Sequence, residues 1–332
     1  MNTRITRLAG WMLCAGVAIA AGSDQKKPPT AGIKAPGVQI PFAALKPEME
    51  FEDASPAWIA IADMVVLPNA ARDGLLRIDG RSKEQKLADP IEGIPGVCGG
   101  AVNAFGSLWT GACGSKGIAK IDAKTGKVTA TLPVGVGPAR LALAASADSI
   151  WALTDARGTL SRIDPKENSV VAEFRVPADC GSLVFGEGAL WLACPAENRV
   201  LRVDVASNVV EKSIDVAAQP EGLTIGDGSI WVLCAKDGKL ERIDPKTNKV
   251  AKTIELGAPA TGGTLAAGEG SVWIGMAGFP LTRVDPQTDK VVQQFWGEGG
   301  GVVAAGMGSV WLAHGGKTLR IDPKRIAATL AE

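Results

Sequence analysis

The chain has no tyrosine, and its 332 residues include a single histidine, His314. It also has no excess of either charge, because 35 Lys and Arg residues balance 35 Asp and Glu residues. With one histidine, a Ser-His-Asp arrangement could use only His314. The balanced charge gives no reason to expect nucleic acid or an anionic membrane surface as a partner.

Several motifs of enzymes and nucleotide-binding proteins are absent as well. The sequence contains no nucleophile elbow, Walker loop, zincin helix or Rossmann fingerprint. Glycine is common, at 41 residues, but it falls in turns rather than in a phosphate-binding pattern. No cofactor is therefore expected.

What the chain does contain is a repeated unit, best seen in residues 226–257. Residues 229–234 are apolar, and residues 239–244 and 249–256 alternate between apolar and polar, which predicts three short strands. Asp-Gly and Asp-Pro-Lys-Thr-Asn separate them and are typical of turns. Residues 222–225 supply a fourth strand. One such sheet cannot bury both of its faces, so it must repeat.

The repeat is marked by a tryptophan in the second strand and an aspartate at the end of the third. The tryptophans are Trp109, Trp151, Trp191, Trp231, Trp273 and Trp311, with Val66 in the first copy. The aspartates are Asp79, Asp122, Asp164, Asp204, Asp244, Asp285 and Asp322. Seven copies of about 40 residues predict an all-β fold, a seven-bladed β-propeller of four-stranded antiparallel blades. A β-helix would have shorter rungs, and a helical solenoid would show a 3.6-residue period.

The sequence divides into three parts. Residues 1–22, with Arg4 and Arg7 before an apolar run, are predicted to be a signal peptide, the alternative being an uncleaved membrane anchor. Residues 23–55 are predicted to be a flexible linker and N-terminal extension, and residues 56–332 the propeller. No membrane span is expected after cleavage, and the mature protein is expected to be periplasmic or secreted.

Two details of ring closure are open at this point. Residues 38–55 lie on the rim of the propeller or add a strand to its last blade. Residues 325–330 are predicted to form the fourth strand of that blade, after a shortened turn. The ring would then close by packing alone, without borrowing an N-terminal strand.

Positions that recur in every blade are interpreted as scaffold. A tryptophan in each second strand is expected to pack between neighbouring blades. The basic residue two positions before each aspartate is on the same strand face, so we expect it to pair with that aspartate, which in turn caps the Asp-Pro turn.

Positions that differ between blades are the candidates for function. The starts of the first strands and the ends of the second strands share one rim of the predicted central funnel, and they carry a mixture of polar and aromatic residues. The ligand-binding candidates are Trp58, Asn69, Arg140, Thr154, Glu221 and His314. Arg140 suits a carboxylate or phosphate, and Trp58 a flat group. His314 would make binding pH-dependent. The alternative is a solvated rim without a ligand.

The cysteines favour disulfides over a metal. Five remain after removal of the signal, in an oxidising compartment. Cys180 and Cys194 flank one predicted hairpin, and Cys98 and Cys113 another, with a bulge at Gly111 restoring the facing of the second pair. Cys234 is left over, because Pro220 stands where its partner would be.

A soft-metal site is the alternative reading of the same positions. Cys194, Cys234, Met276 and His314 occupy one strand position in four consecutive blades, and these residue types suit Cu(I). Equivalent positions of adjacent blades are several ångströms apart around an open funnel, however, and local ligand spacing is absent. No metal is therefore expected.

The repeats Gly-x-Gly-Ser-Ile/Val-Trp and Leu-x-Arg-Ile-Asp-Pro-Lys-Thr-x-Lys-Val resemble those of YVTN-type and streptogramin (virginiamycin B) lyase-like propellers. Resemblance to the lyases implies catalytic histidines in Pro-His-Gly-like segments at the starts of first strands, with a metal nearby. The matching segments here, at Pro56, Pro138 and Pro220, carry no histidine, so no catalytic residue is carried over. Resemblance to the YVTN group implies that this chain is an exported binding protein.

Two functions follow from the sequence. One is a non-catalytic, monomeric propeller that binds a small polar ligand or a protein or peptide at the funnel rim. The other is a lyase or lactone hydrolase that groups His314, Glu221 and Arg140 at that rim.

Overall fold

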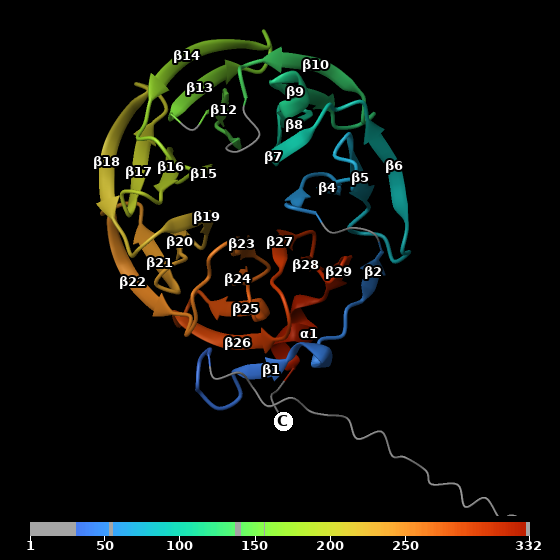
Figure 1. The fold of residues 1–332 in the computed structure, drawn as a ribbon, viewed down its shortest axis with the longest axis vertical. Helices are drawn as coiled ribbons and strands as arrows, with labels where there is room; N and C mark the ends of the chain where they lie inside the picture. The colour runs from blue at the N-terminus through green and yellow to red at the C-terminus, as the bar shows by residue number, and fades with distance from the viewer. Residues whose placement is uncertain (1–30, 53–55, 137–140, 156, 330–332) are drawn as a thin grey trace, which may run out of the picture.

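The chain folds into a ring of seven sheets around a central channel (Figure 1). The computed structural model describes residues 31–52, 56–136, 141–155 and 157–329. Within each sheet the first strand lies at the channel and the fourth at the circumference. The predicted seven-bladed β-propeller of four-stranded antiparallel blades is confirmed, and one blade carries an additional strand.

The strands follow the predicted repeat closely. Blades 1 to 3 consist of β3 (Ala60–Ile61), β4 (Val65–Pro68), β5 (Gly74–Ile78) and β6 (Leu87–Glu92); β7 (Val97–Ala104), β8 (Ser107–Ala112), β9 (Gly117–Asp122) and β10 (Val128–Pro133); and β11 (Ala142–Ala145), β12 (Ile150–Leu153), β13 (Thr159–Asp164) and β14 (Ser169–Arg175). A short 3-10 helix, η2 (Cys113–Ser115), follows β8.

Blades 4 to 7 continue the pattern. They consist of β15 (Ser182–Gly186), β16 (Ala189–Cys194), β17 (Arg199–Asp204) and β18 (Val209–Asp215); β19 (Pro220–Gly226), β20 (Ser229–Cys234), β21 (Lys239–Asp244) and β22 (Lys249–Glu255); β23 (Thr264–Gly268), β24 (Ser271–Met276), β25 (Phe279–Asp285) and β26 (Lys290–Trp296); and β27 (Val302–Gly306), β28 (Ser309–His314) and β29 (Lys317–Ile321).

Tight two-residue turns join the first and second strands of five blades. The turns are Phe105-Gly106, Glu187-Gly188, Asp227-Gly228, Glu269-Gly270 and Met307-Gly308, and φ is positive at both residues of each. Positive φ at both central positions defines a type I′ turn, whose twist matches that of the flanking strands, and glycine adopts it without steric cost. This chemistry explains why the repeat places glycine before each second strand.

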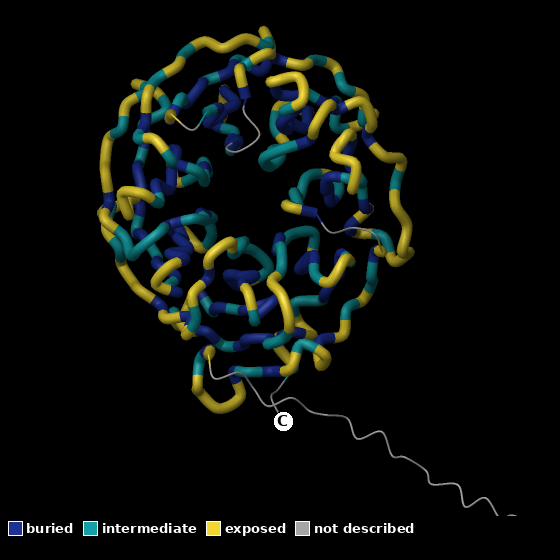
Figure 2. Tube along the Cα trace, viewed as in Figure 1, coloured by how far each residue is buried: buried dark blue, intermediate teal, exposed yellow. Residues whose placement is uncertain are grey.

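The tryptophan column forms the packing layer between blades, as predicted. All six side chains are 0% exposed. Trp231 packs with Leu240 of its own blade and with Val272 and Ile274 of the next. In five of the six, the indole Nε1 donates to the carbonyl of the residue five positions earlier. Figure 2 shows buried positions gathered inside every blade, with exposed positions along the circumference.

The basic column differs from its prediction. Five arginines and Lys120 lie over the tryptophan of their own blade, 5.1 to 6.0 Å from the ring centroid. Several do not pair with the aspartate two residues later but reach the turn of the following blade. Lys120 donates to Pro165 O at 2.7 Å, and Arg242 pairs with Asp289 at 2.8 Å. Part of the column therefore links neighbouring blades, whereas Arg202 pairs with Glu211 and Arg283 binds Gln293 within their own blades.

The same reach closes the ring, since Arg320 of blade 7 donates to Ser82 O of blade 1. The aspartates cap their turns as predicted: Asp244 Oδ1 accepts from Lys246 N at 2.8 Å, for example. These backbone hydrogen bonds hold the pKa of Asp244 below its usual value.

Ring closure confirms one alternative for residues 38–55, the added strand in the last blade, and contradicts closure by packing alone. The fourth strand of blade 7 is β2 (Met49–Phe51), which pairs antiparallel with β29. Ahead of it, β1 (Gln39–Pro41) pairs parallel with β26 as a fifth strand of blade 6, and the 3-10 helix η1 (Phe42–Ala44) connects the two. We call residues 31–51 the strap. It does borrow an N-terminal strand for closure, so closure by packing alone is wrong.

Residues 325–330, predicted as that fourth strand, lie mostly in a short helix, α1 (Pro323–Ala328). The Asp322 side chain accepts from Lys324 N as an N-cap, and Pro323 stands at the first turn, where its missing N–H costs nothing. The Thr-Asn that continues the turn in blade 5 is absent here, and the Ala-rich segment favours helix. No helix of the described residues is long and apolar enough to cross a membrane.

Candidate functional site

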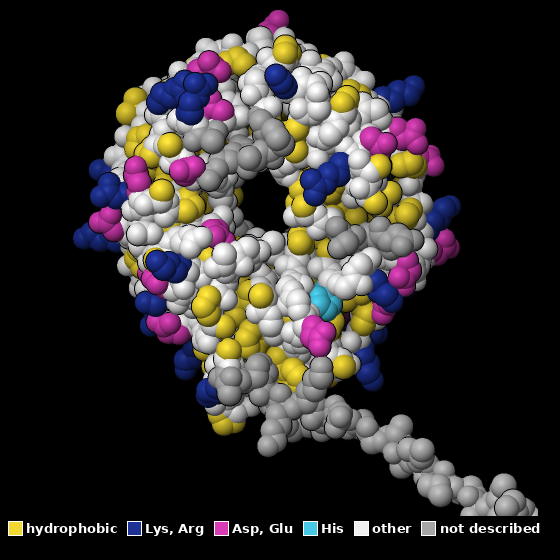
Figure 3. All heavy atoms as spheres, viewed as in Figure 1, with side chains coloured by type: hydrophobic (Ala, Val, Ile, Leu, Met, Phe, Trp, Pro, Cys, Tyr) yellow, Lys and Arg dark blue, Asp and Glu magenta, His cyan; other side chains and the backbone are white. Residues whose placement is uncertain are grey.

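The candidate site faces one side of the ring, which we call the rim face. It is formed by the loops that enter the first strands and by those that join the second strands to the third. Figure 3 views this face and shows an open channel through its middle. The described loops on it include residues 69–73, 93–96, 113–116, 195–198, 216–219, 235–238, 256–263, 297–301 and 315–316.

The channel wall uses its polar side chains to join neighbouring blades. Ser182 Oγ accepts from Leu223 N at 3.1 Å, and Thr224 Oγ1 accepts from Ala267 N at 3.1 Å. Thr264 Oγ1 accepts from Val303 N at 3.0 Å and donates to Gly301 O at 2.9 Å. These hydroxyls tie blades 4 to 7 together.

Glu221 is a predicted candidate whose side chain binds residues of two blades. It lies near the start of β19 and is partly buried. One carboxylate oxygen accepts from Gln219 Nε2 at 2.6 Å, and the other accepts from Gly262 N at 2.8 Å. Glu221 therefore bridges the entry loops of blades 5 and 6.

His314 ends β28 in blade 7 and contacts the strap. Its Nδ1 lies 2.8 Å from Gly300 O, and its ring meets Phe42 edge-on, with 4.5 Å between centroids. Two different parts of the chain thus fix the ring plane and leave Nε2 as the nitrogen that can meet a ligand. His314 therefore also contacts the strap, which the sequence did not indicate.

The remaining candidates differ in their surroundings. Trp58 is partly buried against the core shared by blades 1 and 2. Asn69 exchanges hydrogen bonds with Asp73 inside its own turn, at 2.7 and 3.1 Å. Thr154 is 4% exposed, and its hydroxyl donates to Thr159 O. Arg140 lies outside the described residues. The structure spreads the described candidates over blades 1, 3, 5 and 7 rather than gathering them into one cluster.

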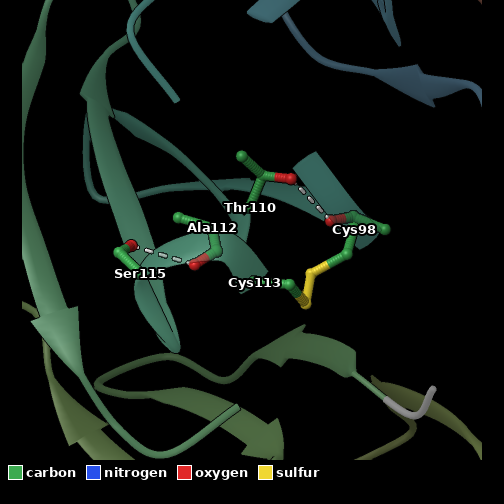
Figure 4. Close-up of a disulfide and its surroundings, with 6 residues drawn as sticks. Cys98, Thr110, Ala112, Cys113 and Ser115 are labelled. Carbon is green, nitrogen blue, oxygen red and sulfur yellow. Dashed lines mark hydrogen bonds between the residues drawn. A yellow bond between two sulfur atoms is a disulfide. The ribbon is translucent and has the colours of Figure 1, made fainter. Parts of the chain in front are cut away.

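Both predicted disulfides are present and both lie at the rim face. Cys180–Cys194 joins the entry of blade 4 to the end of its second strand, with 3.9 Å between Cα atoms. Cys98–Cys113 does the same in blade 2, at 5.9 Å (Figure 4). The bulge that allows the second pair lies at Gly99-Gly100, not at Gly111 as predicted, because the register shifts between Cys98 and Ala101.

Blade 5 replaces this cross-link with hydrogen bonds. Pro220 lies opposite Cys234, as predicted, and Cys234 is a buried free thiol. Burial, followed by the nearby Glu241 carboxylate, raises the pKa of the thiol far above its usual value, so it stays protonated and unreactive. Glu241 itself is buried and accepts from Ala217 N at 3.0 Å and from Thr253 Oγ1 at 3.0 Å.

The four residues weighed as a soft-metal set are separated in this way. Cys194 is in a disulfide, while Cys234 and Met276 are buried inside their blades. Within the part of the chain that the structure describes, no group of three or more His, Cys, Asp or Glu residues is placed to hold a metal ion.

Sequence reasoning missed a groove on the rim face between blades 4 and 5. It has a volume of about 370 Å³ and is lined by Pro195, Ala196, Asn198, Ala218, Gln219 and Lys236. We call it the 4–5 groove. Its lining comes from loops of two blades, so no local sequence pattern reveals it. Gln219 connects it to Glu221.

Comparison with known proteins places the fold. No family model matches the sequence, and no curated protein matches it either. Solved structures do: a streptogramin B lyase matches with a TM-score of 0.70 and 17% identity, covering 82% of this chain and 96% of that chain. This chain has a streptogramin-lyase-like propeller fold. The virginiamycin B lyase of Staphylococcus aureus matches with a TM-score of 0.69 and 15% identity, covering 82% and 97%. At such identity the likeness concerns the fold alone.

Proposed function

We propose that this protein is an exported, non-catalytic propeller that binds a small polar ligand or a peptide at its rim face. The observation that carries the proposal is the 4–5 groove, a hollow of about 370 Å³ that is lined by loops of two blades. A volume of this order suits a small molecule or a few residues of a peptide. Glu221, Trp58, Asn69, Thr154, Arg140 and His314 are the further rim candidates under the same proposal.

The contrast between repeated positions and variable rim loops supports this proposal. Residue types that recur in all blades are engaged in the scaffold: tryptophan indoles bind carbonyls, and basic side chains bind neighbouring turns. Rim loops vary from blade to blade and are free of that constraint. Function is then expected on loops that a rigid scaffold positions.

Export is supported by the two disulfides, because such bonds persist in oxidising compartments. The proposed signal peptide, residues 1–22, lies outside the described residues. N-terminal sequencing of the mature protein tests export: a start between residues 21 and 24 is expected, and a cytosolic protein that retains Met1 would contradict it.

A lyase or lactone hydrolase is the second candidate, and the fold it shares with streptogramin lyases favours it. In this chain such chemistry would rest on His314 Nε2 as a base, because Nδ1 is held by Gly300 O. Turnover of a streptogramin or lactone substrate that disappears in His314→Ala would establish this candidate and reject the non-catalytic one.

The binding proposal is tested by screening polar small molecules and short peptides for a shift in melting temperature, followed by calorimetry on each hit. Lys236→Met, Glu221→Gln and His314→Ala are the rim variants, and Lys212→Met, an exposed lysine of the outer strand β18, is the matched control. At least one rim variant should weaken binding while the control leaves it unchanged. Hits whose affinity no rim variant alters would reject a rim site.

A further inference from the structure

Several oxygens around the 4–5 groove hold its loops in place. Asn198 Oδ1 accepts from Gln219 N at 2.9 Å, Asn198 O accepts from Val216 N at 3.0 Å, and Gln219 O accepts from Ala235 N at 2.9 Å. These hydrogen bonds fix the loops that carry the lining.

Two nearby carboxylates hold the entry loop of blade 5. Asp237 Oδ2 accepts from Ala218 N at 2.8 Å, and Glu241 accepts from Ala217 N at 3.0 Å. With Asn198 on Gln219 N, three consecutive backbone amides of the entry loop are each bound by a side-chain oxygen. Glu221 is likewise engaged through both of its oxygens.

Two donors of the groove have no partner among the described residues, whereas Gln219 Nε2 donates to Glu221. Lys236 is exposed, and neither its ammonium group nor the Asn198 Nδ2 group makes a hydrogen bond or ion pair with any residue that the structure describes. Asn198 Oδ1 is fixed by Gln219 N, so the amide nitrogen on the other branch of the side chain is oriented as well. An ammonium and an amide NH₂ on one hollow present three and two N–H donors respectively.

The rest of the lining is small and apolar. Pro195, Ala196 and Ala218 carry no polar side-chain atom and leave room for an alkyl group. A ligand that matches these two donors has hydrogen-bond acceptors at one end and a short aliphatic part at the other. A carboxylate fits the donors, because a charged hydrogen bond is stronger than a neutral one.

The entry loop of blade 5 has no covalent cross-link. In blade 4 the corresponding loop ends at Cys180, which is bonded to Cys194. In blade 5 residues 216–219 are held by hydrogen bonds alone, since Pro220 faces Cys234. Hydrogen bonds to three side chains allow small adjustments that a covalent cross-link prevents.

We propose that the 4–5 groove binds a carboxylate on a short aliphatic group, with Lys236 Nζ and Asn198 Nδ2 donating to its oxygens. The source is a small free acid or the C-terminus of a peptide, which offer the same chemistry. This inference rests on the proposed binding function and names its ligand class.

The experiment titrates the full chain with butyrate, with N-acetyl-Ala-Ala-Ala and with the C-terminal amide of that peptide, using calorimetry or chemical-shift changes. Saturable binding of at least one of the two carboxylate probes is expected, and none of the amide. Butyrate alone identifies a free acid as the source, and the peptide a C-terminus. Lys236→Met and Asn198→Asp should each weaken binding by about tenfold or more.

Asn198→Asp is the sharper variant, because the aspartate keeps the oxygen that caps Gln219 N but replaces the donor with an acceptor. Lys212→Met is the control and should bind like the parent chain. If the acid and the amide bind equally well and Lys236→Met still weakens binding, the ligand is not recognised through a carboxylate. The proposal of a binding site on the rim face would then stand. No binding of either acid, or unchanged affinity in both groove variants, would overturn the inference.

Discussion

The tryptophan and basic layer and the rim face are built on opposite principles. In the layer, one solution recurs: a fully buried indole bound to a carbonyl, with a cation above it that in several blades reaches the next blade. At the rim, blades 2 and 4 use disulfides where blade 5 uses three side-chain caps, and blade 7 contacts the strap through His314.

The difference teaches where substitutions are costly. Each repeated unit satisfies its own polar groups and packs on its neighbour, so a change there leaves a cavity or an unpaired group in a dense layer. A rim loop has solvent on one side, and its side chains act locally. The predictions below contrast these regions, beginning with the element that closes the ring.

Removal of the strap should have the largest effect. A chain beginning at residue 56 loses β1 and β2 and exposes the edges of β26 and β29. It also loses Ile40, which is 0% exposed, and so uncovers the core against which Ile40 packs. We expect loss of cooperative thermal unfolding, measured by circular dichroism. A chain beginning at residue 31 is the control and should melt like the parent. Identical melting of both would show that the strap does not close the ring.

Trp231→Ala should cost about 3–5 kcal/mol of unfolding free energy, because it removes a fully buried aromatic side chain from the seam of blades 5 and 6. Denaturant unfolding measures it. Trp58→Ala, which truncates a partly buried tryptophan on the rim, is the matched comparison and should cost less. A larger cost for Trp58→Ala than for Trp231→Ala would contradict the assignment of Trp231 to the scaffold and of Trp58 to the site.

Opening the blade 4 disulfide with Cys180→Ala and Cys194→Ala together should cost about 3 kcal/mol, the loop-closure value for a separation of this length. Cys234→Ala in blade 5 removes a sulfur from the equivalent strand position without breaking a cross-link, so its cost should be smaller. Chemical denaturation under non-reducing conditions compares them, and equal costs would assign the stabilisation to packing.

Acid should weaken the scaffold through the capped turns. The pKa is lowered at five turn aspartates, Asp122, Asp164, Asp204, Asp244 and Asp285. The main cause is hydrogen bonding from the turn that follows, by backbone N–H groups or, at Asp204, first by the Ser207 hydroxyl. Because the folded-state pKa lies below the unfolded one, their contribution is present above about pH 4 and is lost as pH falls through the folded-state values.

Urea unfolding at a series of pH values measures this effect. Asp244→Asn should reduce the slope of stability against pH below about pH 4, because the amide does not titrate. A slope that the substitution leaves unchanged would assign the acid sensitivity to other carboxylates.

The smallest effects on stability are expected at the rim. His314→Ala and Lys236→Met should stay within about 0.5 kcal/mol of the parent chain, because their side chains lie at the surface. Differential scanning calorimetry checks this. A loss comparable with that of Trp231→Ala would show that the contact of His314 with Phe42 belongs to the scaffold.

The number and type of blades could be predicted from the chain alone, and so could both disulfides. Each repeated unit has strands in which apolar and polar residues alternate, glycines in its turns and, in six of the seven copies, a tryptophan. Few folds satisfy this pattern, since each unit must bury its faces on its neighbours. Cys180 and Cys194 flank one hairpin, so local register brings them together. These features depend on residues close in sequence.

Tertiary structure alone decided what depends on residues far apart. The strap pairs residues 39–51 with strands near the other end of the chain. The sequence left open whether residues 38–55 lie on the rim or add a strand to the last blade, and it did not indicate β1 as a partner of blade 6. Lys120 and Arg242 have aspartates two residues away, yet the neighbouring blade offers partners that the extended side chain reaches more readily. The 4–5 groove exists because two non-repeated loops from successive blades meet at one seam. Local periodicity specifies the blade, whereas the path of the ring sets which blade edges and loops come together, and that path is a property of the whole chain.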